Sequence, residues 1–323
     1  MNEFFHPDST GGTGTVLSDL ARALRGRYED VEIDVLTSRN LYRGEADALP
    51  SAEDWDGVHI TRLATPRPNG LPTPLRLGAN LLFAGAALLA LLRRRRYDLL
   101  LVGTAPPTVA IAAQLLKRLT GTPYLYTVYD LEPDCAITLG LLRPDHPLTR
   151  TLRRCQKGWL HAAGRAVVLG RCMRDHLGRA YDLPEHRIAV IPVGADPDEI
   201  VPRPKDTDFR RRQGLGGFLV CYSGNFGRYH DFDTILDAAR RLQTLRDDVT
   251  FVLVGDGAQK PHIARRVAGE GLRNVRLFPF VPRDDYADLL ASADVSLVTL
   301  EVGMEGLCVP SKFYSILASG RPT

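Results

Sequence analysis

Residues 218–257, FLVCYSGNFGRYHDFDTILDAARRLQTLRDDVTFVLVGDG, decide the fold. The apolar runs at the two ends of this stretch have the length and the β-branched and aromatic content of buried strands. The segment between them predicts a helix, because these apolar side chains recur on one helical face: Phe232, Ile235, Leu236, Ala239 and Leu242. Two strands joined by a helix form the repeating unit of a parallel α/β sheet.

Both predicted strands run into a glycine loop, at residues 223–227 and 255–257. In a parallel sheet with covering helices, such loops lie at the carboxyl edge, where helix N-termini expose unpaired N–H groups suited to phosphate. Glycine permits positive φ and lets a ligand approach the backbone closely. Tight turns after strands also use glycine, so a purely structural reading of each loop stays open.

Three later segments follow in a characteristic order: NVRLFPFV at 274–281, ASADVSLVTL at 291–300 and GLCVPSKFYSILASGRP at 306–322. In this order and spacing they resemble the donor-binding half of the family 4, or group 1, glycosyltransferases. The resemblance implies an α/β fold of the GT-B type, with two Rossmann-like doubly wound domains facing across a cleft. It also implies transfer of a sugar, with retention, from a nucleoside diphosphate sugar to a glycan or polyprenyl-linked acceptor, in cell-surface polysaccharide or glycolipid synthesis.

The resemblance and the two glycine loops together define a candidate donor-binding site. Its predicted members are Gly224, Asn225, Gly227, Arg228, Gly255, Gly257, Val281, Pro310, Ser311 and Lys312. The family typically carries an Arg and a Lys near the first loop, and this chain has Asn225 and His230 at those positions. Arg228 and Lys312 are therefore the expected cations for the diphosphate, whose negative charge grows as it leaves.

A second departure concerns two glutamates that many family members carry eight positions apart, the latter contacting the nucleotide ribose. The matching positions here are Leu307 and Ser315, so that contact has no obvious equivalent. Glu301 and Glu305 are the nearby carboxylates that could substitute.

Asp130 is the predicted catalytic residue, because it follows the strand-like run PYLYTVYD, where similar enzymes carry an acidic residue or a histidine. A carboxylate there could orient the acceptor hydroxyl or stabilise a developing oxocarbenium ion. The alternative is a capping or turn aspartate. Near the N-terminus, Gly11, Gly12 and Thr13 form a loop before a predicted helix and could receive donor phosphate or acceptor.

No metal site and no cofactor beyond the sugar nucleotide are predicted. Asp-x-Asp occurs at 196–198, 206–208 and 231–233, but none of these follows a strand in the way a metal-binding motif does. Two other functions remain open: a sugar-nucleotide epimerase of the same architecture, and a non-catalytic sugar-nucleotide binding subunit. The epimerase would need clustered acid and base groups, and the binding subunit is suggested by the departures at Asn225, Leu307 and Ser315.

The composition is that of a globular protein of 323 residues, long enough for two domains. With 41 basic and 38 acidic residues, the charge is too balanced to indicate nucleic-acid binding. The five cysteines are widely spaced and lack zinc spacing, and no signal-peptide pattern opens the chain, so we expect a reducing, cytoplasmic location.

Three regions follow from the pattern along the chain. Residues 1–194 alternate strands and helices and predict an acceptor-side Rossmann-like domain, residues 195–217 predict a polar, proline-containing linker, and residues 218–323 predict the nucleotide-sugar domain. Little of a first strand precedes the GG loop, and the closing GRPT normally enters a further strand. We therefore expect the chain to be a piece of a longer protein, cut at both ends.

Residues 77–92 form an apolar run of 16 residues, and four arginines follow at 93–96. A membrane-spanning helix needs roughly 20 apolar residues, so this run predicts no crossing. Two interpretations remain: a helix buried against the first sheet, or a peripheral contact of residues 77–96 with the inner face of the cell membrane.

Overall fold

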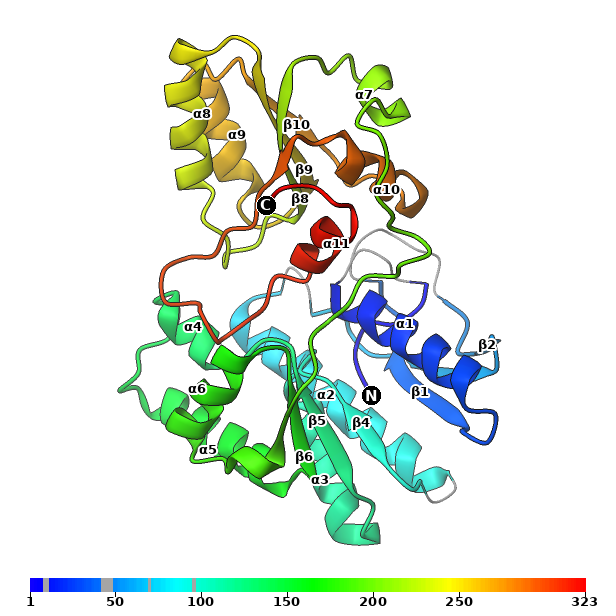
Figure 1. The fold of residues 1–323 in the computed structure, drawn as a ribbon. Helices are drawn as coiled ribbons and strands as arrows, with labels where there is room; N and C mark the ends of the chain where they lie inside the picture. The colour runs from blue at the N-terminus through cyan, green and yellow to red at the C-terminus, as the bar shows by residue number, and fades with distance from the viewer. Residues whose placement is uncertain (8–11, 42–48, 69–70, 95–96) are drawn as a thin grey trace. The chain divides into compact units, whose positions relative to one another are not determined.

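The computed structural model describes residues 1–7, 12–41, 49–68, 71–94 and 97–323. The chain divides into two units, each built of mainly parallel strands with covering helices (Figure 1). Unit 1 comprises Met1–Pro192 and Gly306–Val309, and unit 2 comprises Val193–Glu305 and Pro310–Thr323. The α/β fold with two Rossmann-like units, predicted from sequence, is confirmed.

Unit 1 contains two groups of strands. The first has the order β1-β3-β2, with β1 and β3 parallel and β2 antiparallel, and the second is the parallel group β4-β5-β6-β7. The strands are β1 (Ile33–Ser38), β2 (Ala52–Trp55), β3 (Val58–Leu63), β4 (Leu100–Val102), β5 (Tyr124–Val128), β6 (Arg165–Val168) and β7 (Ile188–Val190).

The N-terminal residues lie between these two groups and bond to both. Asn2 N donates to Leu36 O at 3.2 Å, just inside β1, while Gly103 N, just after β4, donates to Met1 O at 3.1 Å. Glu3 N donates to Ala105 O at 2.6 Å. Residues 1–3 thus lie between β1 and the end of β4, although the sequence predicts that most of a first strand is missing.

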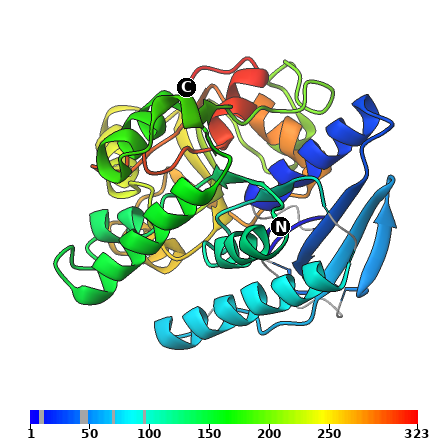
Figure 2. The same cartoon turned by 90° about the horizontal axis from the view of Figure 1, so that it is seen from below.

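Six helices and a short 3₁₀ turn of unit 1 are described: α1 (Gly12–Arg27), α2 (Thr73–Arg93), α3 (Val109–Thr120), α4 (Asp134–Thr138), α5 (Pro147–Ala162), α6 (Arg171–Tyr181) and η1 (Glu185–Arg187). Helix α2 packs on α3 and lies along the outside of unit 1 (Figure 2). Its inner face carries Ala79, Phe83, Ala87 and Leu91, all at most 5% exposed.

Unit 2 is a four-stranded parallel sheet of order β10-β9-β8-β11. Its strands are β8 (Phe218–Asn225), β9 (Val249–Asp256), β10 (Val275–Phe278) and β11 (Val295–Ser296), and its helices are α7 (Asp208–Arg212), α8 (Asp233–Leu245), α9 (Lys260–Gly269), α10 (Arg283–Ser292) and α11 (Lys312–Ala318). The strand–helix–strand unit predicted for residues 218–257 is confirmed.

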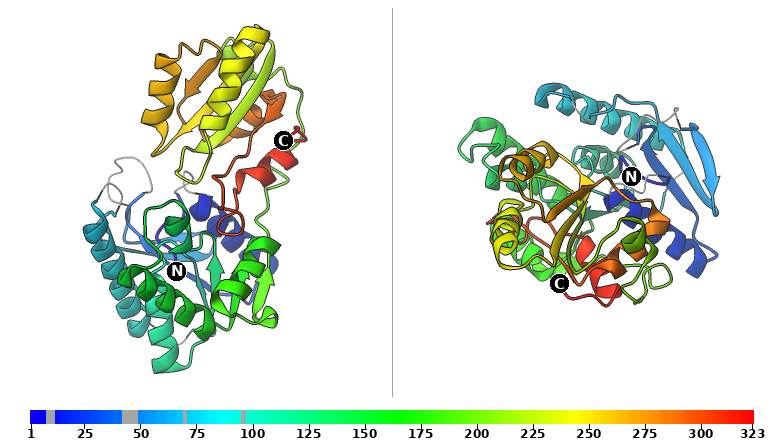
Figure 3. Two further views of the ribbon diagram at one scale, coloured as in Figure 1. Left: turned by 90° about the vertical axis from the view of Figure 1, so that its left-hand side faces the viewer. Right: turned by 90° about the horizontal axis from the view of Figure 1, so that it is seen from above.

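Successive side chains of β8 point to opposite faces of the sheet, so the core of unit 2 consists of two apolar layers. Val220 and Tyr222 face α8 and α9, which lie side by side (Figure 3), and pack there with Phe226 and Phe232. Leu219 and Cys221 face the opposite way, toward side chains of α7 and α10. Apolar residues thus cover both faces of the sheet, as a parallel sheet requires.

The segment predicted as a linker, 195–217, belongs to unit 2 in the structure. It contains α7, whose Phe209 is 3% exposed, and Leu215 is 6% exposed in the same apolar layer. Phe209 and Leu215 attach residues 195–217 to the core of unit 2. The rest of the segment is polar, so its composition alone predicts a linker. Residues Gly306–Val309, predicted as part of the second domain, make their contacts with unit 1.

Candidate functional site

The two glycine loops of unit 2 pack directly on one another at the carboxyl edge of the sheet. In the β8–β9 register, Gly224 lies opposite Gly255. Gly255 has φ +148°, and a Cβ atom there would lie 1.9 Å from the carbonyl oxygen of Gly224. A Cβ on Gly257, at φ +158°, would lie 2.5 Å from Phe226 O. Gly255 and Gly257 are therefore needed because the two backbone segments pack closely on each other. This packing forms the sheet edge at which the sequence predicts phosphate binding.

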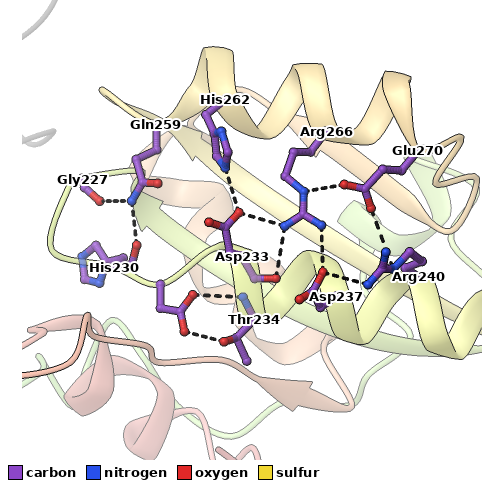
Figure 4. Close-up of polar contacts among 11 residues, drawn as sticks. Gly227, His230, Asp233, Thr234, Asp237, Arg240, Gln259, His262, Arg266 and Glu270 are labelled. Atoms are coloured by element: carbon purple, nitrogen blue, oxygen red, sulfur yellow. Dashed lines mark hydrogen bonds and ion pairs between the residues drawn. The ribbon is translucent and has the colours of Figure 1, made fainter.

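Gln259, which the sequence analysis did not single out, holds the first of these loops. Its Nε2 donates to Gly227 O at 2.9 Å and to His230 O at 2.6 Å (Figure 4). Its backbone N–H donates to Phe226 O at 2.9 Å. Nothing in a single sequence marks this glutamine, because its partners are backbone carbonyls about thirty residues earlier.

An ion-pair cluster in turn holds α9, the helix that follows Gln259, against α8. Arg266 on α9 contacts Asp233 and Asp237 on α8, both at 2.8 Å, and Glu270 at 2.5 Å (Figure 4). His262 adds a contact to Asp233 at 2.8 Å. Gln259, which holds the loop of residues 227–230, is therefore followed by a helix, α9, that ion pairs fix against α8.

Lys312, the first residue of α11, extends its side chain across Gly224. A Cβ atom on Gly224, which has φ +130°, would lie 3.2 Å from Lys312 Cε. Its Nζ lies 3.6 Å from the centroid of the Tyr222 ring. Although the residue as a whole is half-buried, Nζ is fully buried and has no hydrogen-bond partner among the described residues. Burial lowers the pKa of Lys312 to about 7.

His230 stands where the family usually has a lysine, but its imidazole is neutral. Burial lowers the pKa of His230 to about 4. Nδ1 lies 2.7 Å from the carbonyl oxygen of Thr299. Since a carbonyl only accepts, Nδ1 carries the proton and Nε2 is left as an acceptor. His230 therefore supplies no positive charge to this loop.

The other predicted donor residues occupy varied positions in unit 2. Asn225, the last residue of β8, and Arg228, on the loop that follows, are both exposed. Val281 packs beside the apolar layer that contains Phe209. Pro310 and Ser311 directly precede α11 and are half-buried. The structure thus brings Gly224, Gly255 and Lys312 together, and leaves Arg228 as a solvent-exposed cation on the same loop.

Ser315, at the position of the family's second glutamate, serves packing within unit 2. The hydroxyl of Tyr286 on α10 is hydrogen-bonded to the side chains of Ser223 and Ser315, and burial raises its pKa. Leu307, at the position of the first glutamate, is 3% exposed, and its carbonyl accepts from Leu131 N at 2.8 Å within unit 1.

In unit 1, Asp130 lies just beyond the carboxyl end of β5, as predicted. Its backbone N–H, like that of Tyr129, donates to Thr104 Oγ1, at 3.4 and 3.1 Å. It forms an isolated antiparallel bridge with Cys308. Burial, reinforced by the negative charge of Glu132, raises the pKa of Asp130 to about 6.

A second buried carboxyl group, which the sequence analysis missed, belongs to Glu3. Its backbone N–H donates to Ala105 O, after β4, at the same carboxyl edge of the sheet as Asp130. Glu3 is 6% exposed, and burial raises its pKa to about 7. Gly12 and Thr13 open α1, while Gly11 lies outside the described residues. Within the described ranges, no group of three or more His, Cys, Asp or Glu side chains could hold a metal ion.

Residues 11–194 match the glycosyl transferase 4-like domain, and residues 217–323 match the glycosyl transferases group 1 domain. The chain belongs to the group 1 glycosyltransferases. The probable glycosyltransferase WbjE of Pseudomonas aeruginosa is 31% identical over 232 residues, which cover 71% of this chain and 57% of that protein. The chain thus spans less than two thirds of the length of this relative.

Solved structures of other glycosyltransferases share the GT-B fold of this family member. Sucrose-phosphate synthase from Thermosynechococcus elongatus matches with a TM-score of 0.76 and 17% identity, over 100% of this chain and 77% of that one. Anabaena HepE in complex with UDP-glucose matches with a TM-score of 0.70 and 15% identity, over 99% and 78%. These likenesses establish the fold.

Proposed function

We propose that this chain transfers a sugar from a nucleoside diphosphate sugar to a glycan or polyprenyl-linked acceptor, with retention and without a metal ion, in polysaccharide or glycolipid synthesis. Family membership supports the reaction class, and the complex of HepE with UDP-glucose supports a sugar nucleotide as donor. The observation that carries the proposal is the buried amine of Lys312 beside Gly224, at the sheet edge where phosphate binds in this kind of fold.

In this proposal the donor diphosphate lies at the loop after β8. The loop backbone approaches it at Gly224 and Gly227, while Lys312 and the exposed Arg228 supply positive charge. Cations are needed there because the leaving nucleoside diphosphate gains negative charge in the transition state. Gln259 keeps the loop in place through Gly227 O and His230 O.

Asp130 acts on the acceptor side of the reaction. With its pKa at about 6, the carboxyl group is mainly ionised at pH 7, so it accepts a hydrogen bond from an acceptor hydroxyl and increases the nucleophilicity of the oxygen. A half-buried carboxylate is more effective in this role than a solvated one, because the surrounding dielectric is lower.

The test is release of nucleoside diphosphate from UDP-glucose, GDP-mannose and ADP-glucose in the presence of a membrane extract that supplies acceptors. We expect release from one donor, and we expect Asp130→Asn to reduce it at least about 100-fold while leaving binding of that donor unchanged. Donor binding that is lost together with turnover would contradict the role of Asp130. No binding of any sugar nucleotide or nucleoside diphosphate would contradict the proposed function.

A second candidate is a non-catalytic subunit that binds sugar nucleotides. It is favoured by two observations: Ser315 bonds to Tyr286 at the position of a family glutamate, and His230 is neutral at the position of a lysine. Donor binding without release from any acceptor preparation, in a chain that carries all its natural residues, would support this candidate over the enzyme.

We also propose that α2 makes a peripheral contact with the cytoplasmic face of the cell membrane. The helix is longer than the 16-residue run predicted, and the window Leu75–Arg93 satisfies the length and composition of a membrane-spanning helix, with 28% of it buried. Its outer face carries the exposed leucines Leu75, Leu81, Leu82, Leu89 and Leu92. Since its inner face is packed in unit 1, a helix lying in the interface fits better than a crossing.

A further inference from the structure

The side chain of Lys312 is unusual because its charged form would have no polar partner among the described residues. Its Nζ is fully buried, makes no hydrogen bond within the described part of the chain, and lies over the face of Tyr222 at 3.6 Å. A buried ammonium group normally forms an ion pair or several hydrogen bonds, since burial without them is costly. The aromatic face offsets only a part of this cost.

The groups around this amine carry no negative charge. On β8 these are Tyr222 and Cys221, whose pKa values are both raised by burial, that of Cys221 to about 12. From the loop after β8 comes the neutral imidazole of His230. Among the described residues, no carboxylate lies within ion-pair distance of Lys312 Nζ. An uncharged amine therefore suits this environment better than an ammonium ion.

We propose that Lys312 is an uncharged amine in the empty site and takes up one proton from solvent when the diphosphate of a sugar nucleotide binds. The inference rests on the proposed function and adds to it a coupling between protonation and donor binding. The proton adds to the free electron pair of Nζ, and the resulting ammonium ion pairs with the phosphate oxygens. No bond breaks, and the buffer is the only proton donor required.

A lysine suits this role where an arginine does not. An amine changes its charge readily when it is buried, whereas guanidinium stays protonated in proteins. The proposal therefore explains why the buried cation of this site is a lysine on α11, with Tyr222 beneath it, while the arginine of the site, Arg228, is exposed on the loop.

The pH dependence follows from linkage. The pKa of Lys312 is about 7 in the empty site, and nearby phosphate raises it in the complex. Above pH 7 the empty site loses its proton and the complex keeps it, so affinity falls as pH rises. The second ionisation of phosphate, with a pKa of about 6, is complete in this range. Between pH 8 and pH 9, Kd should therefore increase about tenfold.

The experiment is isothermal titration calorimetry of the full chain at pH 8, in HEPES and in Tris, with UDP, GDP, ADP and dTDP. The difference in apparent enthalpy between the two buffers gives the number of protons taken up. For the tightest-binding diphosphate, we expect close to one proton per site, and an increase of about tenfold in Kd at pH 9.

Two substitutions at Lys312 and one at a matched control lysine show whether the proton is taken up by Lys312 or by another group. Lys312→Arg keeps a permanent charge, so binding without proton uptake is expected, and Lys312→Met should give weaker binding that also takes up no proton. Lys205→Met removes an exposed lysine of unit 2 that pairs with Asp294 at 2.8 Å, and it should leave the proton count unchanged. Binding of a diphosphate by the unmodified chain without proton uptake would overturn the inference and leave the proposed function standing. Binding of none of the four would overturn both.

Discussion

Asp130 and Lys312 are the acid and the base of the candidate site on which the proposed chemistry depends, and the pKa values of both are shifted. For both of them burial is the main cause, and it acts in opposite directions: it raises the pKa of the acid and lowers that of the base. Shifted pKa values of this kind are typical of functional sites, because catalytic and binding groups need pKa values that suit their task.

For Asp130 this cost can be measured directly. Its pKa is raised from 3.8 to about 6, so the folded chain binds the proton more tightly than the unfolded chain, and stability falls as pH rises from about 4 to 6. The amide of Asp130→Asn has the shape of the protonated acid and does not ionise, so the variant does not lose this folding stability as pH rises. At pH 7 we expect the variant to be more stable than the parent by about 1 to 3 kcal/mol, with a much smaller difference at pH 4, measured by urea denaturation. Loss of stability at pH 7 would instead identify Asp130 as a structural turn residue.

Arg228 differs from Lys312 in its exposure to solvent. An exposed cation is screened by water and salt, so its contact with phosphate contributes less than a buried one. We expect Arg228→Ala to weaken nucleoside diphosphate binding by up to about tenfold at low salt and less at 0.5 M NaCl. Binding of the corresponding nucleoside should change little. Equal loss of affinity for nucleoside and diphosphate would identify Arg228 as a structural arginine.

At the scale of elements, the junction of β8 and β9 depends on glycine for packing. A Cβ on Gly255 would lie 1.9 Å from Gly224 O, and the backbone there has φ +148°. Gly255→Ala should therefore lower the free energy of unfolding by about 3 kcal/mol or more. Gly269→Ala, in α9, is the matched control because a Cβ there meets nothing within 4 Å. Equal midpoints for the two variants in thermal unfolding would contradict this account.

Helix α2 presents an unpartnered row of leucines on its outer face. Leu82→Ser with Leu89→Ser removes apolar surface from residues that are 60% and 55% exposed, so it should reduce flotation with anionic liposomes without unfolding unit 1. Replacing residues 93–96 by Gln should reduce flotation too, most clearly at low salt. Leu245→Ser, at a leucine that is 75% exposed on α8, is the control. Unchanged flotation in both α2 variants would show that the leucine row does not bind lipid.

At the scale of the whole molecule, periodicity and motif order were sufficient to predict two α/β units and the family. The strand–helix–strand unit of residues 218–257 could be predicted because its pattern is local. Helix α7 was missed because only Phe209 and Leu215 anchor it in an otherwise polar segment. The chemistry of Lys312 could not be predicted, since Tyr222 and His230, which determine it, lie more than eighty residues earlier in the chain.

The central claim is that unit 2 binds a nucleoside diphosphate beside Gly224 and Lys312. The most direct test is calorimetric titration of the full chain at pH 7 with UDP, GDP, ADP and dTDP, and with the four corresponding nucleosides. We predict that one diphosphate binds with one-to-one stoichiometry and at least about tenfold more tightly than its nucleoside, and that Lys312→Met removes most of this difference. Binding of no diphosphate, or a nucleoside that binds as tightly as its diphosphate, would contradict the claim.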